Sequence, residues 1–132
     1  MPVAFDVVWC KYPQLQHGQD PGPVARPCLV RKPYTHLTTI KGKEYTVGYV
    51  DVIYGTKWVD KFTPPQGFHV DDAAEKKACG LKVDTVFDLL DHEILPWSLT
   101  YFSNDNGRPT IGGRFTGAMQ TRLKEQVKLL QR

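Results

Sequence analysis

Paired cysteines and metal-binding histidine motifs are missing from this sequence. Its three cysteines, Cys10, Cys28 and Cys79, are odd in number and far apart, and no CxxC pair occurs. This excludes a zinc knuckle and a disulfide framework, and a reduced, buried thiol is the ordinary expectation for Cys10 and Cys28. None of the four histidines stands in an HxxxH or HxH spacing. We therefore expect neither a metal site nor a cofactor.

The sequence also lacks the short motifs of several large enzyme classes. GxxxxGK[ST], GxGxxG, HExxH and GxSxG are absent, so nothing supports a nucleotide-phosphate loop, a zinc protease or a serine hydrolase. No apolar run approaches the length that spans a membrane, and the start, MPVAFDVVWC, has no basic segment followed by a long apolar one. We expect a cytoplasmic protein that has no membrane partner.

What the sequence does contain is typical of one folded domain. It has 132 residues, of which 41% are hydrophobic and 11% aromatic, which is enough for one core and argues against disorder. We therefore interpret residues 1–132 as a single domain. The formal net charge is +3. This mild excess is compatible with an anionic partner such as RNA, and equally with ordinary solubility.

Short stretches rich in β-branched and aromatic residues predict a mainly β fold. AFDVVWC (4–10) and RPCLVR (26–31) are typical of strands, and a long loop rich in Pro, Gly, Gln and Asp separates them. A hairpin turn is expected at 41–43, before a long strand over 45–54 in which Gly48 marks a bulge. The stretch DTVFDLLDHEIL (84–95) fits either a strand or a helix.

Two helices are predicted beside these strands. Asp71 or Asp72 can cap a short helix near 71–79, which Gly80 would end. From about Thr116 the chain is expected to be helical, because apolar residues recur there at helical spacing. The intervening SNDNGRPTIGGR is typical of a turn-rich linker. Together these elements predict a small antiparallel β-barrel or curled sheet, with the C-terminal helix covering one opening or edge.

Arg26 is the first candidate for chemistry. Pro27 restricts Arg26 to extended backbone angles, which defines the direction of its side chain more closely. The long loop before it can form one wall of a groove. The rigid fork of donors on arginine suits a phosphate whose charge grows during in-line cleavage. The plain structural alternative is a surface arginine in a local salt bridge.

Thr56 and Asp88 are further candidates, each with a structural alternative. Thr56 follows Gly55 at the end of the long predicted strand, so its hydroxyl, beside Lys57, could donate to a phosphate oxygen or bond its own turn. Asp88 lies among apolar neighbours in VFDLL, where a carboxylate is costly to bury unless it is paired or functional. It could act as a base or take part in an ion pair.

The aromatic and loop residues offer weaker signals. Trp9 is expected in the core, whereas Trp58 and Trp97 could either stack on bases or pack inside the protein. His17 lies in the first loop, where it could touch a ligand or be solvated. These residues alone do not separate a binding site from an ordinary surface.

Several of these pieces together resemble the MazF/PemK/Kid-type toxin family. DVVWC, a Gly/Pro-rich loop and then RPCLV are similar to the family's opening, and YGT at the end of a long strand is similar to the end of its third strand. CGLKVDTVFDL followed by ILPW resembles one PemK-like branch. The resemblance covers most of the chain to about Phe102, and the terminal helix more faintly.

The resemblance implies a type II toxin–antitoxin protein. Its fold would be a compact, SH3-like β-barrel that forms a homodimer, and a cognate antitoxin would neutralise it through an acidic, disordered tail. Its activity would be the metal-independent cleavage of single-stranded RNA at short sequences, in which the 2′-hydroxyl of the RNA attacks the adjacent phosphate. The protein would supply a proton acceptor, a proton donor and a stabiliser of the phosphate charge.

The resemblance also assigns roles to residues. Arg26 would stabilise the phosphate and could act as an acid, Thr56 would donate a hydroxyl hydrogen bond, and Asp88 would be a base or orienting group. The predicted substrate-binding residues are found in the first loop, after the long strand and in the Pro-Trp pair of ILPW: Gln14, Gln16, His17, Lys57 and Trp97.

One departure from the family pattern keeps a second function open. Relatives of Kid carry an arginine two residues before the aspartate, and this chain has Val86 there. The alternative is therefore a catalytically weakened or inactive relative that binds nucleic acid or protein, such as a phage accessory module. A CcdB-like, gyrase-binding role is less well supported, because the terminal helix ends KLLQR without a tryptophan.

Overall fold

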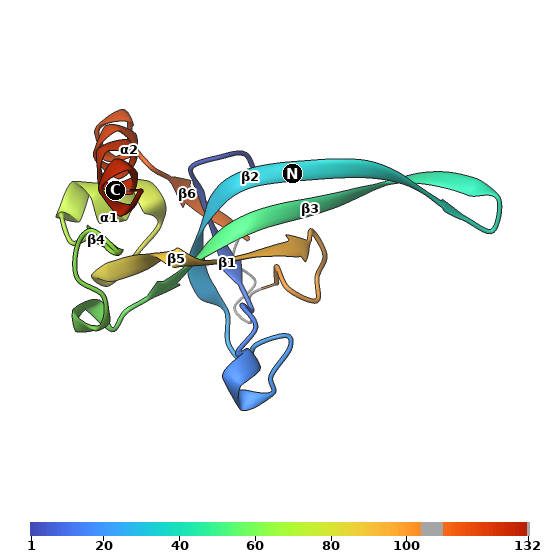
Figure 1. Ribbon diagram of the computed structural model, residues 1–132, viewed down its shortest axis with the longest axis horizontal. Coiled ribbons are helices and arrows are strands. Elements are labelled where there is room, and N and C mark those ends of the chain that lie inside the picture. Colours follow the sequence, from blue (N-terminus) through green and yellow to red (C-terminus); the bar gives the residue numbers. More distant parts are fainter. Residues whose placement is uncertain (104–109, 132) are drawn as a thin grey trace.

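The computed structural model describes residues 1–103 and 110–131, and its centre is one antiparallel sheet (Figure 1). Over these residues it has six strands: β1 (Asp6–Cys10), β2 (Arg26–Ile40), β3 (Lys43–Thr56), β4 (Gly67–Val70), β5 (Thr85–Pro96) and β6 (Ile111–Arg114). The helices are α1 (Ala73–Cys79) and α2 (Gly117–Leu130), with short 3₁₀ turns at Leu15–His17 and Val59–Lys61. The prediction of a mainly β domain with these two helices is confirmed. No helix in the described part of the chain has the length and apolar character needed to cross a membrane.

The sheet is open, which corrects the expectation of a closed SH3-like barrel. Its strand order is β4-β5-β3-β2-β1-β6, and the edge strands β4 and β6 do not pair over the residues described. The end of α1 lies against β6 instead. A Cβ atom added to Gly113 would clash with the backbone of Ala78 and Cys79, and one added to Gly80 would clash with Gly112. The helix that follows β4 therefore lies against β6, where a closing strand pair would otherwise form.

One hydrophobic core lies between the sheet and the two helices. Val7, Leu29 and Ile53 contribute from the central strands, and α2 adds Met119 and Leu123. Phe115, just before α2, stacks on Phe68 with ring centroids 5.3 Å apart and meets Phe87 edge-on at 5.7 Å. This core fixes α2 over one face of the sheet.

A second core lies on the other face of the same strands. It contains Val8, Cys28, Val30 and Val52 from the central strands. Tyr12, Tyr54, Leu95 and Phe102 complete it. Alternating side chains of β1, β2 and β3 thus enter different cores, as expected for strands that are buried on both faces.

β2 and β3 continue past the body of the sheet as a long two-stranded hairpin (Figure 1). Their pairing runs without a break from Lys32–Asp51 to Ile40–Lys43, and the turn has positive φ at Lys41 (52°) and Gly42 (80°). The turn predicted at 41–43 is confirmed. The bulge predicted at Gly48 is wrong, since Gly48 pairs regularly with Thr35, and the register shifts instead at Val30/Lys32 and at Ile53/Gly55.

α1 begins and ends, and α2 begins, where the sequence indicates. The Asp72 carboxylate accepts a hydrogen bond from Glu75 N at 3.0 Å, and Gly80 ends α1 in the left-handed conformation with φ 71°. Thr116 Oγ1 accepts from Met119 N at 3.2 Å at the start of α2. Local capping chemistry therefore places these helices correctly.

Two further stretches are strands. For one the sequence left the choice between strand and helix open, and the other was expected to be a linker. The ambiguous 84–95 stretch is β5, whose pairing with both β3 and β4 settles the choice. The end of the expected turn-rich linker is β6, which pairs with β1 from Asp6–Arg114 onward. The part of that linker at 104–109 lies outside the described residues.

Candidate functional site

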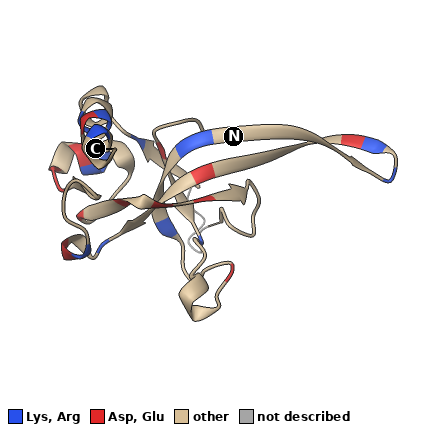
Figure 2. Ribbon diagram, in the orientation of Figure 1, with Lys and Arg blue, Asp and Glu red and all other residues tan. Residues whose placement is uncertain are grey.

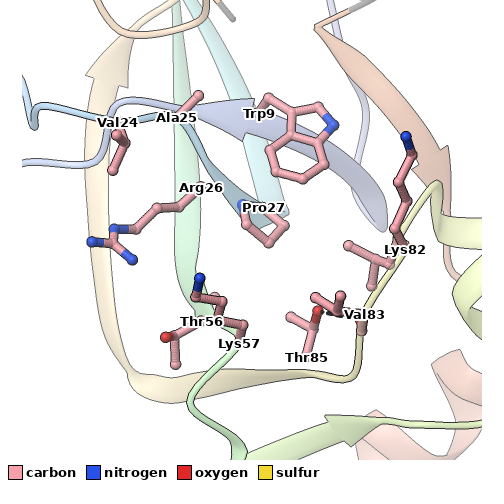
Figure 3. A pocket seen from close by; sticks show the side chains of 12 residues that line it. Trp9, Val24, Ala25, Arg26, Pro27, Thr56, Lys57, Lys82, Val83 and Thr85 are labelled. Carbon is pink, nitrogen blue, oxygen red and sulfur yellow. Dashed lines mark hydrogen bonds between the residues drawn. The ribbon is translucent and has the colours of Figure 1, made fainter.

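Arg26, Thr56 and Lys57 line two cavities at the end of the sheet where β2 begins and β3 ends. The first has a volume of about 450 Å³ and the second about 740 Å³. The first extends toward Trp9, Pro27, Lys82, Val83 and Thr85 (Figure 3). The second extends toward the first loop and the 3₁₀ turn after β3, and its further lining residues are Gln14, Gln16, His17, Tyr54, Trp58, Val59, Asp60 and Lys61. The two cavities therefore share the residues in which a phosphate site was predicted.

Strand register sets Arg26 beside Thr56. Cys28 pairs with Tyr54 in the antiparallel β2–β3 ladder. Continuing that register by two residues brings Arg26 opposite Thr56, and side chains directly opposite in such a pair lie on the same face. In Figure 3 both side chains lie on the same side of the cavity. We call the two cavities together the cleft. The place of these two residues side by side in it follows from ordinary antiparallel sheet geometry.

Gly55 allows the two strands to approach closely at this point. A Cβ atom at this position would clash with the Pro27 carbonyl oxygen and come within 2.8 Å of the Phe87 ring. The sequence interpretation of Gly55 as a position of close backbone approach is consistent with this contact. Pro27 itself lies opposite Trp9 of β1, so β2 is held on both sides at its start.

Aromatic rings support the Arg26 guanidinium. Its Cζ atom lies 5.9 Å from the centroid of the Tyr54 ring, which in turn contacts the Tyr12 ring at 5.2 Å. Tyr12 is anchored because its hydroxyl donates to Asp91 at 2.6 Å. Burial, together with the Asp91 carboxylate, raises the pKa of Tyr12, so this hydroxyl stays protonated as a donor. This tilted ring pair limits the positions that Arg26 can take.

Thr56 is buried, but its hydroxyl keeps a free donor. The residue is 1% exposed, and its Oγ1 atom accepts a hydrogen bond from Trp58 N at 3.2 Å. A hydroxyl that accepts one bond still has its own proton to donate. The turn that this bond stabilises directs the chain to Trp58, whose side chain is 67% exposed at the second cavity. The same geometry therefore allows both alternatives for Thr56, a hydrogen bond within its own turn and donation of its hydroxyl proton to a phosphate oxygen.

The cavities carry positive charge that is not neutralised by ion pairs. In the described part of the chain, Arg26, Lys57 and Lys82 make no salt bridge, although six other ion pairs are present. Asp60 is the acidic residue lining the second cavity, next to Lys61. Leaving three cations without carboxylate partners at one cleft favours an anionic ligand.

The first loop forms a wall of the second cavity, as predicted. Gln14, Gln16 and His17 all line it. Gln14 N donates to Gln19 O at 2.7 Å and Gln14 Nε2 to Tyr12 O at 3.4 Å, so the loop closes on itself next to the ring cluster. Gly18 completes the turn with φ 66°. The loop presents two amides and an imidazole toward the cavity.

Asp88 lies apart from these residues. It is 6% exposed, and its Oδ1 atom accepts hydrogen bonds from Gln66 Nε2 at 3.0 Å and Leu90 N at 3.1 Å. It is not among the residues that line either cavity. Val86, at the position of the family arginine, is fully buried beside Thr56 in the β3–β5 pairing. The contacts of Asp88 are those of a structural carboxylate that fixes the turn ending at Gln66.

Two of the tryptophans, Trp97 and Trp9, do not lie where they were expected. Trp97 packs on Phe102 with ring centroids 4.6 Å apart, away from both cavities, and its backbone N donates to Gly48 O. Trp9, expected in the core, is only half-buried and lines the first cavity. Trp58 lies at the second cavity. The sequence could not separate the roles of Trp9 and Trp97, because both follow apolar residues, whereas Trp58 stands among charged neighbours.

Lys82 is the cationic residue that sequence reasoning missed. It lies in the connection between α1 and β5, and it reaches the first cavity together with Val83 (Figure 3). In the sequence Lys82 is marked only as a lysine shortly after the glycine that ends α1, which does not indicate a binding role. Lys82 lines the first cavity on the side away from Arg26 (Figure 3), and its place there depends on long-range packing of α1 against the sheet.

Neither the cysteines nor a ligand cluster adds chemistry to the cleft. All three thiols are free and buried, and burial raises the pKa of Cys79 to about 11. Over the residues that the structure describes, no three His, Cys, Asp or Glu side chains come together as possible metal ligands.

Comparison of the chain with family models, with curated proteins and with solved structures finds no match. The proposed function therefore rests on the geometry of the cleft and on the resemblance of the chain's short motifs.

Proposed function

We propose that this protein is a MazF/PemK-like endoribonuclease that cleaves single-stranded RNA without a metal ion. The observation that carries the proposal is the shared cleft, in which Arg26 and Thr56 lie together with Lys57 and Lys82 and no salt bridge neutralises the cations. Such a cleft suits the sugar–phosphate backbone of a nucleic acid, because phosphate contacts dominate its binding.

The proposed reaction is an internal transfer on the RNA. The 2′-hydroxyl oxygen attacks the adjacent phosphorus and loses its proton, and the bond to the 5′-oxygen breaks as that oxygen gains a proton. The products are a 2′,3′-cyclic phosphate and a free 5′-hydroxyl. Arg26 and the Thr56 hydroxyl would stabilise the charge on the equatorial phosphate oxygens, with Lys57 adding a further positive charge.

Proton transfer requires a group beside this phosphate. Among the residues lining the cavities, His17 and Asp60 can accept a proton. We assign this role to His17, because an imidazole can both take a proton from the 2′-oxygen and supply one to the 5′-oxygen. Asp88 takes no part in this scheme, since its carboxylate is occupied by Gln66 and Leu90. Gln14 and Gln16 would contact the neighbouring nucleotides.

The same cleft would take a cognate antitoxin. An acidic, disordered tail lying across Gln14, Gln16 and Lys57 would neutralise the cations and exclude RNA. Homodimer formation, which the resemblance implies, would complete the toxin. Both partners follow from the proposed function.

One observation favours a second candidate, a relative that binds RNA without cutting it. Val86 is buried where the family arginine would stand, and Asp88 lines neither of the two cavities. A chain that lost both groups would keep the basic cleft and its affinity for RNA. Binding without cleavage is the result that would distinguish it.

The test is a cleavage assay of purified protein on mixed single-stranded RNA in EDTA. The parent chain is expected to produce 5′-hydroxyl ends. Arg26→Ala should lose at least about a hundredfold in rate, the usual effect of removing one stabilising donor. Arg26→Lys keeps the charge but not the fork, and should recover only part of the rate.

The matched control is Lys77→Ala, which removes an exposed lysine of α1 outside the cavities. It should cleave at the parent rate. If every preparation, including antitoxin-free protein, binds RNA without cleaving it, the binding module is favoured. If Arg26→Ala cleaves as fast as the parent, the assignment of the cleft fails.

A further inference from the structure

A second surface with binding character lies on the hairpin that extends from the sheet. We define the arm as residues 32–50 of the β2–β3 hairpin (Figure 1). At its base β3 still pairs with β5 through Tyr49 and Val50, and toward the turn the arm is a two-stranded ribbon. An isolated two-stranded ribbon is only marginally stable in water. An arm of this length is therefore expected to have a partner on at least one face.

The register divides the arm into two faces of different chemistry, because residues directly opposite in a ladder share a face. The aromatic face is Lys32, Tyr34, His36, Thr38, Ile40, Lys43, Tyr45, Val47 and Tyr49. The opposite face is Pro33, Thr35, Leu37, Thr39, Glu44, Thr46, Gly48 and Val50. All three tyrosines of the arm thus lie on the same side.

Lysines flank a row of rings along the aromatic face, with Lys32 at the base and Lys43 at the tip. The His36 ring stacks on Tyr49 with centroids 5.2 Å apart and an interplanar angle of 13°. Lys32 Nζ lies 5.1 Å from the centroid of the Tyr34 ring. Tyr34, Tyr45 and Ile40 remain 37%, 47% and 55% exposed. At its base the opposite face is covered instead, since a Cβ on Gly48 would meet the side chains of Met1 and Trp97.

The charge of the arm is also divided between its faces. Three lysines, Lys32, Lys41 and Lys43, stand against one acid, Glu44, and the register turns Glu44 to the opposite face. Figure 2 shows cationic segments at the tip and at the base of the arm. Asp51 at the base is 2% exposed, and Arg31 and His92 hold its carboxylate at 3.1 and 3.0 Å. The exposed aromatic face is therefore positively charged.

We propose that the aromatic face of the arm binds single-stranded RNA, with bases stacked on Tyr34 and Tyr45 and phosphates held by Lys32 and Lys43. Exposed rings flanked by cations form the kind of platform on which unpaired bases stack regardless of sequence. The arm lies at the opposite end of β2 and β3 from Arg26 and Thr56, so this is a separate site. It rests on the proposed function only in taking RNA as the ligand.

The test measures the affinity of the full chain for a fluorescein-labelled single-stranded oligouridylate by anisotropy. Arg26→Ala is the background, so that the probe stays intact. Replacing Tyr34 and Tyr45 by alanine together should weaken binding by about tenfold per ring. The double exchange to phenylalanine keeps the rings and should bind like the background. Lys32→Ala with Lys43→Ala should lower the slope of log affinity against log salt by about 0.7 for each lost phosphate contact.

Leu37→Ala and Thr46→Ala, on the opposite face, are the matched controls and should leave the affinity unchanged. Circular dichroism checks that every variant is folded. Unchanged affinity in the double alanine variant overturns the proposal. A second outcome also overturns it: sedimentation detects a concentration-dependent dimer in the parent, and the double alanine variant abolishes that dimer. The face would then bind a second copy of the chain. Loss of cleavage in Arg26→Ala with binding retained shows that the two sites are independent.

Discussion

Arg26 owes its position to the residues around it in the sheet. Pro27 holds the start of β2 opposite Trp9, Gly55 lets β3 come close to Pro27, and Tyr54 supports the guanidinium from below. None of these neighbours is charged, so the guanidinium keeps its donors for a ligand. A phosphate would find in this cleft a fork of donors whose direction is already fixed.

Thr56→Val tests the hydroxyl of this site at constant shape. Valine keeps the size of threonine but cannot donate to a phosphate oxygen, so cleavage should fall by about a hundredfold. It also cannot accept from Trp58 N, which should cost about 1 kcal/mol in the free energy of unfolding. Single-turnover cleavage and urea denaturation measure the two effects separately.

Thr56→Ser is the control, because it retains the hydroxyl, and it should cleave within a few-fold of the parent rate. Should the valine variant cleave as fast as the serine variant, the hydroxyl would have no part in the chemistry. Its role would then be limited to the turn before Trp58.

At the scale of elements, α1 determines that the sheet stays open. The helix follows β4 directly, and its last turn contacts the two glycines of β6 rather than leaving room for a strand pair. The connection after it carries Lys82 to the first cavity. The packing of this one short helix therefore both shapes the sheet and adds a cation to the candidate site.

Gly113→Ala should disturb this contact. The added methyl group would clash with Ala78 and Cys79, and overpacking of this kind costs about 1–3 kcal/mol in the free energy of unfolding. Gly117→Ala is the matched control, since nothing lies within 4 Å of a Cβ there, and it should not destabilise the protein. Urea denaturation of both variants provides the measurement, and equal stability would show that α1 does not pack tightly on β6.

Local signals predicted the elements that local chemistry determines. The cap at Asp72 and the turn at Lys41–Gly42 depend on a few neighbouring residues, and each is where the sequence indicated, as is the start of α2 at about Thr116. The open sheet could not be predicted in this way, because it depends on how α1 packs against β6. β6 was missed for a related reason: Gly112 and Gly113 have low strand propensity, and close contact with Trp9 and α1 is what requires them.

At the scale of the whole molecule, the structure brings together part of the predicted site. Arg26, Thr56, Lys57 and the first loop meet at one cleft, because a β2–β3 register of consecutive residues joins them. Asp88 and Trp97 lie elsewhere, since their positions depend on the course of β5 and the segment after it. Sequence order predicts neighbours along paired strands better than neighbours across the fold.

Two separate surfaces then divide the proposed work on RNA. In this proposal the cleft at one end of β2 and β3 would hold the reacting phosphate, and the arm at the other end would support unpaired bases. β2 and β3 connect these surfaces, and the part of the two strands nearer the cleft contributes to both cores.

The most direct measurement is nuclear magnetic resonance of the labelled protein titrated with a 2′-O-methyl RNA oligonucleotide, which cannot be cleaved. If Arg26 and Thr56 share an RNA-binding cleft, the Arg26 side-chain Nε–H resonance and the backbone amides of Thr56 and Lys57 should shift together at one affinity. Shifts confined to other parts of the protein, with these three resonances unmoved at saturating RNA, would contradict the account.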